Sequence, residues 1–121
     1  MKQGFVKVAS ATPRIRVADP VYNAQVICEQ AKEAAEHGAK IVVFPELCIT
    51  GYTCNDLFLQ ELLLEKAKEA LLTIAEETGQ LETLFLVGLP VDKDGRLYNV
   101  AAVLYRGRIL GMIPKKNIPM Y

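Results

Sequence analysis

The sequence predicts an α/β fold, and three observations carry this prediction. Short segments rich in β-branched residues, at 5–10 and 40–44, alternate with two longer segments of helical period. After residue 83, three short apolar segments follow one another and are separated by turn residues. We therefore expect strand, helix, strand, helix and three further strands, all within one domain over residues 1–121. The composition agrees, because 51% hydrophobic and 23% charged residues are typical of a folded domain.

The first helix has clear start and stop signals. Asp19 can cap it with a carboxylate, and Pro20 suits the first helical position. Gly38 is expected to end the helix in a left-handed conformation, and His37 lies in the last turn, where a cation is favoured. The apolar residues between these ends recur with helical spacing, at Val21, Ala24, Ile27, Cys28, Ala31, Ala34 and Ala35.

The segment at 40–44 is a nearly continuous β-branched run, typical of a strand buried under helices. Pro45 ends it, and a loop from Glu46 to about residue 55 leads to a second helix over 56–78. The remaining strands are expected at 83–90, 98–105 and 108–113, with turns at 92–95 and 106–107. Three strands in succession leave one face of the sheet without helices. We therefore expect this chain to be a fragment of a longer polypeptide, or a domain that continues in another polypeptide.

Composition and motifs argue against several classes of protein. Fourteen basic residues balance fourteen acidic ones, so we expect no nucleic-acid partner and no binding to an anionic membrane. Three cysteines without a CxxC pair, together with one histidine, favour neither a disulfide framework nor a zinc site. No phosphate-binding glycine motif is present. Without a signal-like leader or a long apolar run, the chain is expected to be cytoplasmic.

Glu46 is the first candidate catalytic residue. It follows the strand at 40–44 at its carboxyl end, the edge where open α/β sheets bind ligands. Loss of hydration beside an apolar strand end raises the pKa of a carboxyl group toward that of a useful general base. The alternative is an ordinary loop glutamate or helix cap, which the spacing alone favours.

The other candidates are lysines and cysteines. Lys115 and Lys116 follow the last strand, where a lysine can stabilise a developing oxyanion, although a solvated basic pair is the simpler interpretation. Cys28 lies on the apolar stripe of the first helix and is expected in the core. Cys48 and Cys54 lie in the loop after Glu46, and no histidine is near them in sequence to activate a thiol.

Two ordered blocks of this sequence resemble a known family. ValValPheProGluLeu at 42–47, ThrGlyTyr at 50–52 and AspLeuPhe at 56–58 resemble the first catalytic block of the carbon–nitrogen hydrolase (nitrilase) superfamily. The stretch at 98–119, from TyrAsnValAlaAlaVal to ProLysLysAsnIlePro, resembles the block that carries the family's lysine. The resemblance covers essentially the whole chain and is greatest to the glutaminase domains of glutamine-dependent NAD⁺ synthetases.

The resemblance implies a Glu–Lys–Cys triad and the first half of a four-layer α-β-β-α sandwich. Glu46 would be the general base, and Lys115 rather than Lys116 would stabilise the tetrahedral intermediate. Tyr52 and Tyr121 match positions that line the glutamine pocket. The nucleophilic cysteine belongs to a third block beyond this sequence, so the 121-residue chain alone is expected to be inactive.

The resemblance also implies partners and cofactors. Glutamine would be hydrolysed to ammonia, which a separate ATP-dependent domain uses to amidate nicotinic acid adenine dinucleotide. No cofactor is expected in the present chain, whereas ATP and Mg²⁺ would bind the synthetase domain of a homo-oligomeric parent enzyme. Two alternatives remain open: a stand-alone amidase that acts on another amide, and a non-catalytic α/β module that binds a partner through its open sheet face.

Overall fold

The computed structural model describes residues 7–50 and 61–114, and it confirms the expected order of elements there. The two helices are α1 (Pro20–Glu36) and α2 (Glu61–Glu77). The strands are β1 (Val8–Ser10), β2 (Ile41–Val43), β3 (Leu84–Lys93), β4 (Arg96–Tyr105) and β5 (Arg108–Pro114). The sequence predicts that the first strand begins at residue 5 and the second helix at residue 56. Both of these starting points lie outside the described residues.

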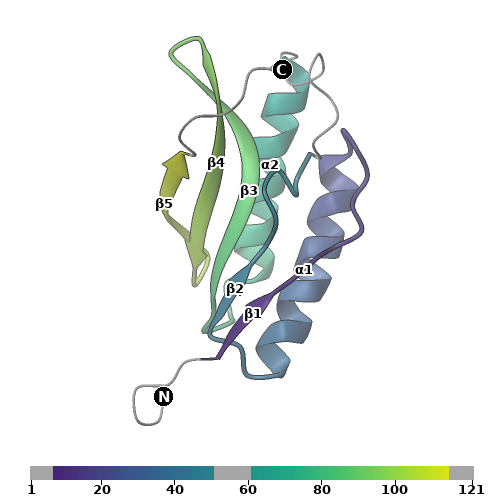
Figure 1. Cartoon of the computed structure of the whole chain (residues 1–121), viewed down its shortest axis with the longest axis vertical. Helices are drawn as coiled ribbons and strands as arrows, with labels where there is room; N and C mark the ends of the chain where they lie inside the picture. The colour runs from purple at the N-terminus through teal and green to yellow at the C-terminus, as the bar shows by residue number, and fades with distance from the viewer. Residues whose placement is uncertain (1–6, 51–60, 115–121) are drawn as a thin grey trace.

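All five strands form one sheet in the order β1-β2-β3-β4-β5 (Figure 1). The first three are parallel, and β4 and β5 pair antiparallel. The crossovers β1–α1–β2 and β2–α2–β3 advance across the sheet in the same direction. With the right-handed connection that such units adopt, both helices must then cover the same face, and Figure 1 shows them there.

Asp19 and Gly38 mark the two ends of α1 as predicted, whereas His37 follows the last turn instead of lying in it. The Asp19 carboxylate accepts a hydrogen bond from the backbone N–H of Tyr22 at 3.2 Å, which satisfies a free donor of the first turn. His37 caps the C-terminal end, and Gly38 follows with a φ of 87°. In the described ranges, no helix combines the length and the apolar character needed to cross a membrane.

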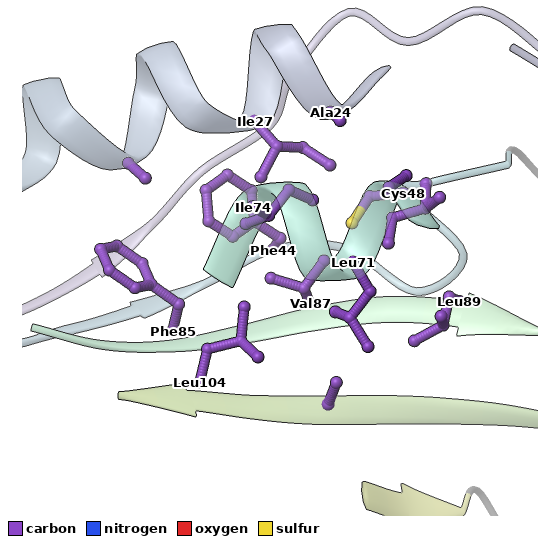
Figure 2. Packing of buried hydrophobic residues seen from close by; sticks show 14 of the residues in the cluster. Ala24, Ile27, Phe44, Cys48, Leu71, Ile74, Phe85, Val87, Leu89 and Leu104 are labelled. Atoms are coloured by element: carbon purple, nitrogen blue, oxygen red, sulfur yellow. The ribbon is translucent and has the colours of Figure 1, made fainter. Parts of the chain in front are cut away.

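The core fills the space between the two helices and the sheet (Figure 2). Alternate residues of the central strands point into it, because successive side chains of a strand face opposite sides. Burial of each large side chain contributes about 1.5–3 kcal/mol relative to exposure. The largest contributors include Ile27, Leu71, Ile74, Phe85, Val87, Leu89 and Leu104.

The opposite face of the sheet is open in the described part of the chain. β5 is exposed along its whole length, and Leu110 and Ile113 keep more than half of their surface in contact with solvent. The expectation that β2 is buried under helices is therefore only half right. Val42 is fully buried, whereas Val43 is 39% exposed, because both helices lie on one face.

Two tight turns connect the last three strands. Asp94 and Gly95 have φ values of 54° and 77°, and Arg106 and Gly107 have values of 53° and 82°. Two consecutive left-handed residues are typical of the type I′ hairpin, whose twist matches that of the strands. The first turn is shorter than the predicted 92–95, since Asp92 and Lys93 remain paired with β4.

Candidate active site

The loop at residues 44–50, here called the Glu46 loop, follows β2 and runs along the edge of β3. The Phe44 N–H donates to the Leu86 carbonyl at 2.9 Å, and the Ile49 N–H donates to the Gly88 carbonyl at 3.2 Å. The loop thus continues the contact that β2 makes with β3 after regular pairing has ended. Glu46 is half-buried there, at the carboxyl end of β2, as the sequence predicts.

The Glu46 carboxylate is close to a polar side chain of β4. Asn99 Nδ2 donates to Glu46 Oε2 at 3.4 Å, near the upper limit of hydrogen-bond length. Asn99 is opposite Pro90 in the pairing of β3 with β4, so it comes from the strand beyond β3. The side chains of Glu46 and Asn99 therefore meet across β3 although they lie 53 residues apart in sequence.

The residue after Glu46 has an uncommon backbone conformation. Leu47 has a φ of 51°, in the left-handed region that costs a non-glycine residue about 1–3 kcal/mol. Its side chain is buried in a small cluster with Leu63 of α2, and its carbonyl accepts from the Thr50 N–H at 3.1 Å. Packing and hydrogen bonding therefore hold the strained turn beside the candidate general base.

Asn23 of α1 ties the other end of the Glu46 loop to the helix layer. Its side chain is fully buried, and its Nδ2 donates to the carbonyls of Ile49 and Arg16, each at 2.7 Å. Its Oδ1 accepts from the Arg16 N–H at 2.6 Å. Asn23 thus joins the segment before α1 to the Glu46 loop after β2. Its role is not evident from the sequence, where the available signal was a polar residue beside the apolar stripe.

The variant Asn23→Leu is expected to lower the free energy of unfolding by about 3 kcal/mol. Leucine has a similar volume but leaves backbone groups of Arg16 and the buried carbonyl of Ile49 without these hydrogen bonds. Urea unfolding followed by circular dichroism would measure the loss. Gln25→Leu, at an exposed position of the same helix, is the control and should change little. A loss below 1 kcal/mol for Asn23→Leu would contradict the assigned role.

The two described cysteines are core residues. Cys28 belongs to the main hydrophobic cluster, which confirms its predicted place, and Cys48 is 1% exposed. Burial is the main cause that raises the pKa of each thiol to about 11, and Glu77 adds to the effect at Cys28. A thiol that stays protonated at neutral pH is a poor nucleophile. Cys54 lies outside the described residues.

A groove of about 500 Å³ lies between α1 and α2, but Glu46 does not line it. Within 7–50 and 61–114, no three His, Cys, Asp or Glu side chains gather as a metal site would require.

Three of the predicted site residues, Tyr52, Lys115 and Tyr121, lie outside the described residues. The strand that leads to Lys115 is described up to Pro114, which is opposite Val100 of β4. Val100 is in turn opposite Leu89, the residue after Gly88. β5 therefore ends level with the part of β3 against which the Glu46 loop packs. The pairing brings Glu46 and Pro114, the residue before Lys115, to the same end of the sheet.

Two residues near Glu46 were missed in the sequence analysis. Asn99 interrupts an apolar strand, and Gly88 lies in the interior of another. A glycine inside a strand often marks a close backbone approach, so a signal was present. Its partner could not be read from the sequence, because the Glu46 loop reaches Gly88 only through the order of the strands.

A profile of the Carbon-nitrogen hydrolase family matches residues 7–119. The glutamine-dependent NAD(+) synthetase of Mycobacterium tuberculosis is 38% identical over 120 residues, with coverage of 99% of this chain and 18% of the relative. The enzyme of that name from Thermotoga maritima is 34% identical over 121 residues, with coverage of 100% and 20%. The chain thus spans about a fifth of the length of these curated relatives.

Solved structures agree with the sequence relatives. The glutamine-dependent NAD(+) synthetase from Cytophaga hutchinsonii superposes with a TM-score of 0.88 at 30% identity, over 94% of this chain and 19% of that one. An amidase from Nesterenkonia sp. gives a TM-score of 0.81 at 22% identity, over 100% and 46%, and shows the shared fold. The predicted nitrilase-like α/β architecture is confirmed as a match to part of such proteins. From the match over residues 7–119, the chain belongs to the carbon–nitrogen hydrolase family.

Proposed function

We propose that this chain is part of the glutaminase domain of a glutamine-dependent NAD⁺ synthetase, with Glu46 as general base and Lys115 as oxyanion donor. The observation that carries the proposal is the position of Glu46. It lies at the carboxyl end of β2, half-buried, in a loop fixed to β3 and α1 by backbone and side-chain hydrogen bonds. A base held in this way is oriented before substrate arrives.

In the proposed reaction, the Glu46 carboxylate takes the proton from a cysteine thiol of the third family block. The thiolate then attacks the side-chain amide carbon of glutamine, and the Lys115 ammonium stabilises the oxyanion that forms. The carbon–nitrogen bond breaks, ammonia leaves with a proton returned from Glu46, and a thioester remains. Water hydrolyses the thioester to glutamate and regenerates the thiol. Tyr52 and Tyr121 are proposed to line the glutamine pocket.

The nucleophile is proposed to lie in the third family block, in the part of the relatives that this chain does not cover. The two described cysteines are unsuited to the role, because both are buried thiols of raised pKa. We accordingly expect no glutaminase activity from the 121-residue chain alone. In the proposed parent enzyme, which works in the cytoplasm as a homo-oligomer, a separate domain uses ATP and Mg²⁺ to transfer the ammonia to nicotinic acid adenine dinucleotide.

Substrate profiling of the complete gene product tests the proposal. We expect release of ammonia from glutamine, coupled to ATP-dependent formation of NAD⁺, and no hydrolysis of simple aliphatic amides such as butyramide. Hydrolysis of butyramide without glutamine use would instead identify a stand-alone amidase. Failure to cleave any amide would favour the non-catalytic module that binds a partner.

A further inference from the structure

The Glu46 loop packs directly on Gly88 of β3. A Cβ atom at Gly88 would lie 2.5 Å from the Leu47 nitrogen, 2.8 Å from the Pro45 oxygen and 3.0 Å from the Glu46 carbonyl carbon. All three are backbone atoms, so they cannot rotate away as the end of a side chain could. The backbone on either side of Glu46 can therefore approach β3 this closely only where the strand has no side chain.

Gly88 also holds the second half of the same loop. Its carbonyl accepts from the Ile49 N–H at 3.2 Å and from the Cys48 thiol at 3.7 Å. One residue of β3 thus contacts the loop both before and after its strained turn at Leu47. This closeness is particular to Gly88, because a Cβ at Gly111, another glycine within a strand of this sheet, would meet no atom within 4 Å.

Asn99 contacts the side chain of Glu46, and Gly88 supports the backbone of the same loop. It lies on β4 and donates to Glu46 Oε2 at 3.4 Å. The pairing of β3 with β4 is continuous from Leu84 opposite Tyr105 to Lys93 opposite Arg96. Gly88 and Asn99 consequently belong to one regularly paired hairpin, and such an element holds side chains more rigidly than a loop does.

From these contacts we infer that the β3–β4 hairpin positions the general base: Gly88 fixes the backbone of the Glu46 loop, and Asn99 fixes the carboxylate. The inference rests on the proposed function, in which Glu46 is the base. Neither residue is assigned contact with substrate. Both act through Glu46, so they are positioning residues and not catalytic groups.

The variant Gly88→Ala is expected to lower kcat for glutamine hydrolysis about 100-fold in the complete gene product, with KM nearly unchanged. The added methyl group forces the loop to move by about 1 Å to restore ordinary van der Waals contact, and misplacement of this size is costly in catalysis. Gly111→Ala makes the same change in another strand of the sheet and is the control, because its methyl group meets no atom of the present chain within 4 Å; it should keep the wild-type kcat.

Asn99 variants test the same inference without crowding the loop. Asn99→Leu removes the donor and is expected to lower kcat about 10-fold. Asn99→Asp keeps the shape but sets a second carboxylate against Glu46, so it should lose more activity than Asn99→Leu. Asn99→Gln, which restores an amide donor, should recover part of the loss. A merely structural asparagine would not produce this order in kcat among variants of equal thermal stability.

The outcomes separate this inference from the proposed function. If Glu46→Gln abolishes activity while Gly88→Ala and Asn99→Leu retain the wild-type kcat, the inference is overturned and the proposed function stands. If the wild-type protein does not hydrolyse glutamine, the proposed function fails. Crystal structures of Gly88→Ala and Gly111→Ala add a readout independent of activity. An unmoved Glu46 loop in Gly88→Ala would also overturn the inference, and if that variant does not fold, the Asn99 series decides.

Discussion

Replacement of Glu46 by glutamine is expected to lower the rate of glutamine hydrolysis by about 10²- to 10⁴-fold in the complete gene product. A neutral amide cannot take the thiol proton that the proposed mechanism assigns to this carboxylate. Glutamine has nearly the same shape as glutamate, and its oxygen can still accept from Asn99. The loop should therefore keep its conformation, and the effect should fall on kcat as measured by ammonia release.

Two controls sharpen the Glu46 experiment. Glu36→Gln, at an exposed position in the last turn of α1, removes the same charge elsewhere and should leave the rate unchanged. Added ammonium salt should restore ATP-dependent NAD⁺ formation in Glu46→Gln, because the proposed defect lies only in the supply of ammonia. A rate within threefold of wild type in Glu46→Gln would show that Glu46 is an ordinary loop carboxylate.

The variant Lys115→Gln is expected to lower kcat by about 10²- to 10³-fold, the usual cost of losing one oxyanion donor. The neighbouring Lys116 provides a matched control in the same segment. Lys116→Gln makes the identical chemical change one position along the chain and should keep most of the activity. Equal losses in the two variants would contradict the assignment of the oxyanion donor to Lys115, and so would full activity in both.

Much of the fold follows from local sequence. The ends of α1 depend on Asp19, Pro20 and Gly38, and these residues act through the few backbone groups around them. The turn at Arg106 and Gly107 depends in the same way on conformational preferences of two residues. Interactions between residues close in sequence form wherever the segment occurs. They can therefore be recognised without knowledge of the rest of the molecule.

Predictions that depended on the surroundings of an element were less complete. The apolar run at 40–44 was expected under helices, yet Val43 is exposed because both crossovers place their helices on the same face. The turn at 92–95 was expected to be longer, yet pairing with β4 retains Asp92 and Lys93 in the strand. In both cases a neighbouring strand or helix, rather than the segment itself, decided the outcome.

For the candidate site too, local sequence determined one part and tertiary structure the other. The sequence by itself determined that an acidic residue follows β2 and that a lysine follows the last strand, since the motif residues are contiguous with those strands. Only the tertiary structure decided what holds Glu46. Gly88 and Asn99 reach it from strands that are distant in the chain, and Asn23 anchors its loop from α1. Strand order and register create these contacts, and no short segment encodes them alone.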